Sequence, residues 1–139
     1  MRVGCWSLVL VTVVLSACAE RTPRRDYMTV IKDRFDRLQA ALREKNGAAL
    51  DSLSSREMID DGMTADSLLR FVSGADRARA FGRFGKYEII YNNKKARIDC
   101  PLIDTAGQTY QAITLTFVRE NDDWKLKRFE PALSPIDSL

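Results

Sequence analysis

Residues 87–130 decide the fold, and they read YEIIYNNKKARIDCPLIDTAGQTYQAITLTFVRENDDWKLKRFE. Apolar and polar side chains alternate through most of this stretch, and a period of two is typical of strands that bury one face. Short polar segments interrupt the alternation, as tight turns between antiparallel neighbours do. The stretch therefore predicts an antiparallel sheet of about four strands: residues 87–91, 96–102, 109–119 and 124–130.

The two faces of the predicted third strand differ in character. Ile113, Leu115 and Phe117 form the more apolar face, which we expect to pack against helices. The other face carries small, β-branched and aromatic side chains: Tyr110, Ala112, Thr114, Thr116 and Val118. Side chains that meet only water are more often charged. This row therefore predicts a surface that binds a second copy or another protein, with Tyr110, Thr114, Thr116 and Val118 as the binding residues. The alternative is that the C-terminal tail covers the row with Leu133, Ile136 and Leu139.

A helical period precedes the sheet. One apolar stripe recurs every three or four residues at Tyr27, Ile31, Phe35, Leu38 and Leu42. This spacing predicts a long helix that Asp26 caps and that ends at Asn46–Gly47. Shorter helices are expected over residues 48–53 and after Thr64. Helices followed by an antiparallel sheet predict an α+β fold, with the N-terminal helices packed on one face of the sheet.

Two further features bear on the core. Residues 75–85 follow neither period, and we expect Phe81 and Phe84 to fill the core from a short helix or loop. Cys100 alternates with apolar residues in the predicted second strand, so we expect it to be a small buried residue and not a reactive thiol.

The first segment has the layout of a secretory signal. Arg2 supplies a positive start, residues 5–15 are apolar, and small residues precede Cys18. The tetrad Leu15-Ser16-Ala17-Cys18 resembles the lipobox of bacterial lipoproteins. This resemblance implies that Cys18 receives a glyceryl lipid on its sulfur and becomes the new N-terminus after cleavage. In that family the freed amine often gains an acyl chain, such as palmitate.

The resemblance divides the chain into a signal peptide (1–17), a lipidated tether (18–25) and an α+β domain (26–139). Ala19, not Asp, follows the cysteine. That choice resembles the outer-membrane sorting class, so the expected location is the cell envelope, on the outer membrane facing the periplasm. The alternative is an uncleaved membrane anchor over residues 3–19. Positive charge directly after the apolar run favours that alternative, because it works against export: Arg21, Arg24 and Arg25.

The domain itself resembles the NTF2-like, cystatin-like superfamily. The resemblance rests on Lys45-Asn46-Gly47-Ala48-Ala49-Leu50 and on Phe117-Val118-Arg119-Glu120 followed by Trp124-Lys125-Leu126. It covers about Tyr27 to Glu130 and implies a curved sheet wrapped round helices as a cone, often with a cavity. Members of this superfamily include enzymes and binding modules.

The composition excludes several classes of function. With 139 residues, 45% of them apolar, the chain has enough material for one domain. Histidine is absent, which removes the commonest general base and the usual zinc ligand. The net charge is only +3 and is scattered, so we expect no nucleic-acid partner. We also expect no metal and no cofactor.

Enzymes of the superfamily use an Asp or His base with a Tyr or Asp donor inside the cone. The residues that could play these roles here are Glu88, Tyr91, Asp99 and Tyr110. Asp99 alternates with Ile98 and Cys100, so it should face away from the helices. No catalytic motif of the superfamily matches this sequence, and we predict no catalytic residues.

These observations together predict a membrane-anchored envelope lipoprotein that acts as a non-catalytic binding or interaction module. The expected partners are the membrane, through the lipid anchor, and a second copy or an envelope protein. No small-molecule ligand is identified. The alternatives are a small-molecule enzyme that uses the cavity and a structural subunit of an envelope assembly.

Overall fold

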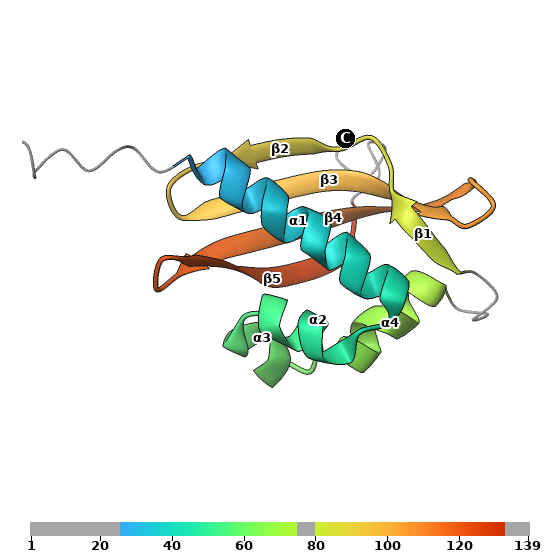
Figure 1. Ribbon diagram of the computed structural model, residues 1–139, viewed down its shortest axis with the longest axis horizontal. Helices are drawn as coiled ribbons and strands as arrows, with labels where there is room; N and C mark the ends of the chain where they lie inside the picture. Colours follow the sequence, from blue (N-terminus) through green and yellow to red (C-terminus); the bar gives the residue numbers. More distant parts are fainter. Residues whose placement is uncertain (1–25, 75–79, 133–139) are drawn as a thin grey trace, which may run out of the picture.

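Helices precede strands in the computed structural model, which describes residues 26–74 and 80–132 (Figure 1). The described helices are α1 (Tyr27–Glu44), α2 (Gly47–Leu53), α3 (Arg56–Asp60) and α4 (Ala65–Ser73). The described strands are β1 (Phe81–Phe84), β2 (Glu88–Tyr91), β3 (Lys95–Asp104), β4 (Thr109–Glu120) and β5 (Asp123–Pro131). This order confirms the predicted α+β fold. The predicted signal peptide, Cys18, the tether and the tail residues Leu133, Ile136 and Leu139 lie outside the described residues.

A side-chain cap begins α1, and a residue in the left-handed conformation ends it. The Asp26 carboxylate accepts a hydrogen bond from the Thr29 N–H at 3.4 Å. The predicted apolar stripe forms the buried face of the helix, with Ile31, Phe35, Leu38 and Leu42. Lys45 ends the helix with a φ of 55°, one residue before the predicted stop. The stop moves because the Asn46 side chain caps α2 instead, accepting from the Ala49 N–H at 3.1 Å.

The junction between α2 and α3 fastens the helices to the sheet. Ser54 and Ser55 are both buried there. The Ser54 hydroxyl donates to the Leu50 carbonyl at 2.8 Å, and the Ser55 hydroxyl caps α3 by accepting from the Met58 N–H at 3.1 Å. The Ser55 N–H donates to the Leu126 carbonyl of β5 at 2.7 Å. Buried backbone groups must be paired, and this bond joins the helical layer to one edge of the sheet.

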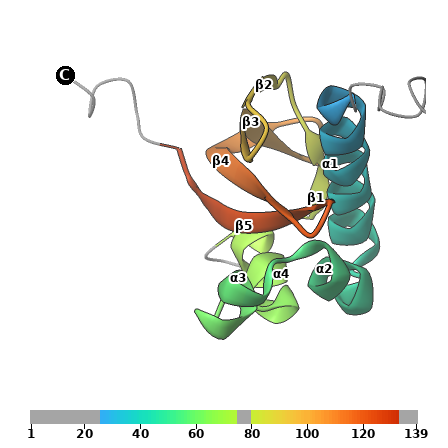
Figure 2. The same ribbon diagram turned by 90° about the vertical axis from the view of Figure 1, so that its left-hand side faces the viewer.

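The five-stranded sheet is antiparallel, with the order β1-β3-β4-β5 and with β2 also paired to β3. β1 pairs with residues 102–104 of β3, and β2 pairs with residues 96–99. β1 and β2 therefore follow each other along one edge, and β5 forms the other edge. Figure 2 shows the sheet curling, with α1 along one side and α2 to α4 below β5.

The strand β1 corrects the prediction of a short helix or loop in this region. Its pairing with β3 shifts between Phe81 and Arg83. The shift turns Phe81 and Phe84 into the core, where they are 7% and 5% exposed. In a regular strand, two residues that are three positions apart point to opposite faces of the sheet. Because Phe81 and Phe84 point to the same face, a period of two did not predict this strand. Gly82 lies at the shift, where a Cβ atom would come within 2.7 Å of the Asp104 carbonyl oxygen.

One core cluster connects the helices and the sheet. Its largest fully buried side chains come from both layers: Trp124, Phe117, Ile31, Leu38, Leu42, Leu50, Leu68, Ile98, Leu102, Ile113, Leu115 and Leu126. The ring of Phe35 stacks on that of Phe84 with centroids 4.8 Å apart. The Tyr27 ring meets the Trp124 ring edge-on at 5.8 Å. The predicted inner face of the third strand is confirmed, since its three residues are fully buried in β4.

Leu38 has no exposed surface, so Leu38→Ala should lower the free energy of unfolding by about 2–5 kcal/mol through the cavity that it leaves. Chemical denaturation followed by circular dichroism measures this loss. Lys32→Ala, on the exposed face of the same helix, is the control and should change the free energy by less than about 0.5 kcal/mol. A loss below about 1 kcal/mol for Leu38→Ala would contradict the described packing.

Candidate functional site

The space between the helices and the sheet is apolar. The buried polar residues of the described part of the chain are Ser54, Ser55 and Thr114. Every Asp and Glu within residues 26–74 and 80–132 is at least partly exposed to solvent. A carboxylate acquires a raised pKa chiefly by burial. The inner space therefore holds no described carboxylate suited to act as a general base.

The four candidate catalytic residues do not converge. Glu88 and Asp99 lie opposite each other in the β2–β3 register, on the sheet face away from the helices. This position of Asp99 agrees with the prediction from its neighbours. Tyr91 lies at the end of β2 and is 43% exposed. The Tyr110 hydroxyl donates to the Val72 carbonyl of α4. No acid and donor among these four share a closed cavity.

The structure places Tyr110 apart from the rest of the predicted interface row. The β3–β4 register shifts between Leu102 and Ile103, and Tyr110 lies at this shift. An extra residue in a strand breaks the alternation of side chains locally. Tyr110 accordingly packs against the core and bonds to Val72 on the helix side. The prediction that it faces outward is wrong, because alternation alone does not reveal a bulge.

Thr114, Thr116 and Val118 remain on the outer face of β4. Thr114 is 9% exposed, and its hydroxyl donates to the Asp99 carboxylate at 2.7 Å. Asp99 also forms an ion pair with Arg97 at 3.2 Å. Thr116 and Val118 are half-buried. Charged residues of β3 and β5 flank this row on both sides: Arg97, Asp99, Arg128 and Glu130. The outer face is therefore a polar surface of mixed charge with a strip of β-branched side chains at its centre.

Cys100 is 5% exposed on the inner side of β3. Burial, with a smaller effect of the Asp99 carboxylate, raises the pKa of its thiol to about 12. The thiol is therefore protonated near neutral pH, whereas the thiolate is the reactive form. Cys100 is a small buried residue, as the sequence predicted.

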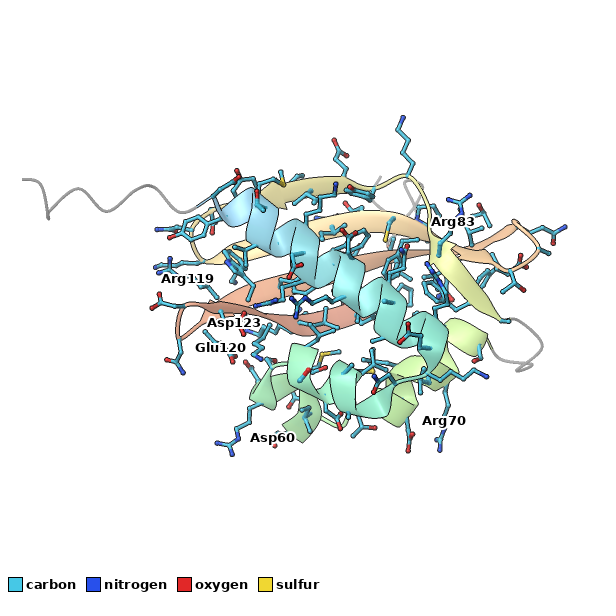
Figure 3. All side chains as sticks on the ribbon, in the orientation of Figure 1. Asp60, Arg70, Arg83, Arg119, Glu120 and Asp123 are labelled. Atoms are coloured by element: carbon cyan, nitrogen blue, oxygen red, sulfur yellow. The ribbon has the colours of Figure 1, made fainter. Side chains whose placement is uncertain are left out.

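Arg34 connects α1 to Asp123, the first residue of β5. Its Nε and one terminal nitrogen donate to the same Asp123 oxygen at 3.0 Å and 2.8 Å. Partial burial raises the pKa of Asp123, but hydrogen bonds from Arg34 and the Trp124 N–H outweigh it and leave that pKa below its ordinary value. Figure 3 labels Asp123 beside Arg119 and Glu120, at the end of the domain where α1 begins. The sequence did not reveal this contact, because its partners are 89 residues apart.

No group of three or more His, Cys, Asp or Glu side chains within residues 26–74 and 80–132 could hold a metal ion. None of the helices that the structure describes is long and apolar enough to cross a membrane.

A surface hollow of about 350 Å³ lies between the α3 region and β5, lined by Met58, Asp61, Met63, Lys127, Arg128, Phe129 and Glu130. Lys127 at its rim forms an ion pair with Glu57 of α3 at 3.5 Å.

The fold has neighbours among solved structures, of which 23 chains match. One is described as an "Ntf2 like protein involved in plasmid conjugation"; it matches with a TM-score of 0.53 and 22% sequence identity over 84% of this chain. The present chain spans 43% of the length of that neighbour. The likeness confirms the predicted NTF2-like fold. No family model and no curated protein match the sequence.

Asp123→Asn should lower the free energy of unfolding at pH 7 by about 0.5–1 kcal/mol, since the ion pair with Arg34 is partly exposed. A carboxyl whose pKa is lowered by folding stabilises the fold above its unfolded pKa of about 3.9, and this contribution is lost as the pH falls through the folded value. Urea unfolding of the two proteins should therefore differ at pH 7 and converge near about pH 2.

The control is Asp36→Asn, which changes an exposed carboxylate on the same helix and should leave the urea midpoint unchanged at both pH values. A stability difference for Asp123→Asn that persists in acid would show that the Arg34 contact is not its cause.

Proposed function

We propose that this chain is an envelope lipoprotein whose NTF2-like domain acts as a non-catalytic binding or interaction module. The observation that carries the proposal is the apolar interior: one continuous core cluster joins helices and sheet, and no described carboxylate is buried. The alternative function, a small-molecule enzyme that uses the cavity, needs a general acid or base and a hydrogen-bond donor together in a closed cavity. A domain without that pair acts through its surface.

The lipid anchor is supported by Leu15-Ser16-Ala17-Cys18 at the end of an apolar segment. A single acyl chain holds a protein weakly, whereas two or three chains anchor it firmly. Residues 19–25 can span at most about 23 Å, so the anchor would hold the domain close to its membrane. Ala19 after the cysteine supports the outer membrane, with the domain in the periplasm.

The end of the domain next to the tether would then face the lipid. α1 begins there at Tyr27, and the Arg119 guanidinium lies 5.4 Å from the centre of the Tyr27 ring. Figure 3 shows Arg119 at this end of the sheet. The far end and the outer sheet face would point into the periplasm, where a second copy or an envelope protein can reach them.

The solved neighbour supports the fold of this module and not its partner. By its name that protein is NTF2-like and involved in plasmid conjugation. Because the two sequences are only 22% identical, we extend to this chain the fold of that protein and not its role. A structural subunit of an envelope assembly remains the second candidate, favoured by the strip of Thr116 and Val118 on the outer sheet face.

Cys18→Ser should abolish lipidation, so the protein should leave the membrane fraction or remain as an uncut precursor. Labelled palmitate incorporation, together with separation of soluble and membrane fractions, measures both outcomes. Cys5→Ser, a second cysteine within the predicted signal peptide, is the matched control and should behave as the wild type. A Cys18→Ser protein that is processed and fractionated like the wild type would refute the proposed anchor.

Thr116→Lys combined with Val118→Lys tests the outer face of β4 as the binding surface. Both side chains are half-buried, and Lys can extend into solvent from such positions, so the variant should stay folded and lose association. Sedimentation of the full chain in detergent measures this loss, with Asp36→Lys on α1 as the control. If the wild type stays monomeric at high concentration and associates with no envelope protein, the sheet-face interface should be abandoned.

A further inference from the structure

The exposed apolar side chains of the described residues gather at the strand β2. The large ones are Tyr87 at 39%, Ile90 at 63% and Tyr91 at 43% exposure, all in β2 or directly before it. Ile90 pairs with Arg97 of β3, so both side chains point to the outer face. Tyr91 pairs with Ala96 and points to the inner face. The strand therefore presents apolar surface on both of its faces.

β2 also has a free backbone edge. The Asn92 N–H donates to the Lys95 carbonyl at 2.9 Å, and hydrogen-bonded pairs alternate with non-bonded pairs along an antiparallel ladder. Ile90 therefore bonds to β3, whereas the N–H and C=O groups of Ile89 and Tyr91 point away from it. Figures 1 and 2 both show β2 at the margin of the sheet, with no described element beyond it.

The opposite edge of the sheet is covered, and the contrast shows what β2 lacks. At β5 the Ser55 N–H donates to the Leu126 carbonyl, and the Lys125 ammonium reaches the Ser52 carbonyl at 2.6 Å. Proteins protect open edges with very short strands, proline, bulges or charges, and of these devices β2 has the short length, four residues. β2 has no proline and no register shift in its pairing with β3, and Glu88 is its one charged residue.

We propose that β2 pairs antiparallel with β2 of a second copy, so that two sheets join edge to edge about a twofold axis. In this register Ile90 lies opposite Ile90 of the second copy. Ile89 and Tyr91 then exchange backbone hydrogen bonds with Tyr91 and Ile89 of that copy. One register thus pairs the free donors and acceptors of both residues and covers the most exposed apolar side chain of the described residues.

The charges near β2 suit this register. Glu88 comes to lie opposite Asn92 of the second copy, with Lys95 of that copy in the next strand. The Asn92 side-chain oxygen accepts from the Lys94 and Lys95 N–H groups at 2.8 Å and 2.9 Å. The NH2 group of Asn92 can therefore donate to the Glu88 carboxylate across the axis. A register shifted by two residues toward Glu88 instead places Ile90 opposite the Glu88 carboxylate, and a shift of four residues places Glu88 opposite Glu88, where like charges repel.

The length of β2 sets the strength of this pairing. An interface along one four-residue strand falls below the roughly 1,000 Å² of stable dimers, so the dimer should be weak in dilute solution. Confinement raises the effective concentration of tethered partners. Edge pairing therefore makes the proposed interaction function more specific, because it names a second copy as the partner. It rests on the proposed membrane anchor, which would bring the copies close enough for most of them to pair.

Disulfide trapping of the full chain in its own membranes tests the pairing. Directly opposed residues of a non-hydrogen-bonded pair have Cβ atoms about 4.5–5.5 Å apart, so Ile90→Cys should form a disulfide-linked dimer under mild oxidation. The wild type, whose Cys100 is buried, is the background control. Asp36→Cys, at an exposed position on α1, is the matched control and should give no more dimer than the wild type, whereas Thr116→Cys reports on the separate sheet-face interface.

A second change separates backbone pairing from simple apolar contact. The Tyr91 N–H points away from β3, so Tyr91→Pro in the Ile90→Cys protein should preserve the fold and remove a bond to the second copy. It should reduce the yield of dimer several-fold, whereas Tyr91→Ser should not. A Tyr91→Pro protein that keeps the thermal midpoint and the full dimer yield would overturn the edge pairing.

The remaining outcomes also distinguish the two interfaces. Cross-linking of Thr116→Cys but not of Ile90→Cys would overturn the edge pairing and leave the sheet-face interface standing. A disulfide from Ile90→Cys to a different protein, without any homodimer, would assign the edge to another partner and overturn the proposal. An Ile90→Cys dimer that persists when Cys18→Ser removes the anchor would support the pairing while refuting the role of confinement.

Discussion

The antiparallel ladder between β3 and β4 is the interaction on which the other elements depend. It runs from the Lys95–Val118 pair to the Ile103–Thr109 pair. Its inner row supplies the apolar surface that the helices cover, and its outer row carries the mixed threonine and charged face. Its one register shift directs Tyr110 to α4. Every other described strand is added to one side or the other of this ladder.

The two edges of the sheet differ in what lies against them. At β5, the α2–α3 junction pairs with the strand through Ser55 and Leu126, so the helical layer closes that side. At β2, the hydrogen-bonding groups of Ile89 and Tyr91 have no described neighbour strand. A small domain with one closed edge and one open edge has a direction in which it can extend its sheet. This asymmetry suits an interaction module.

The interior favours the same view of function. Phe117 and Trp124 are 0% and 1% exposed, and the carboxylates lie at the surface. Cys100, the free thiol of the described residues, is held protonated by burial. Apolar side chains thus fill the described interior, and the polar groups of the described sheet lie on its outer face and at the strand margin.

Several features follow from the sequence by itself, because each depends only on the local period of one element. The stripe of α1 and the inner row of β4 are of this kind, and both are buried as their spacing indicates. The burial of Cys100 and the outward direction of Asp99 follow from the same alternation. The tetrad ending in Cys18 is likewise a feature of local sequence, and the anchor that it indicates stays a prediction.

The remaining features were decided only in the tertiary structure. Phe81 and Phe84 share a face because the strand shifts at Gly82 against β3, and Tyr110 turns to α4 because of a second shift. Arg34 meets a carboxylate 89 residues away. A bulge, a distant ion pair or an open edge depends on which strand lies alongside, and a local period carries no information about that neighbour.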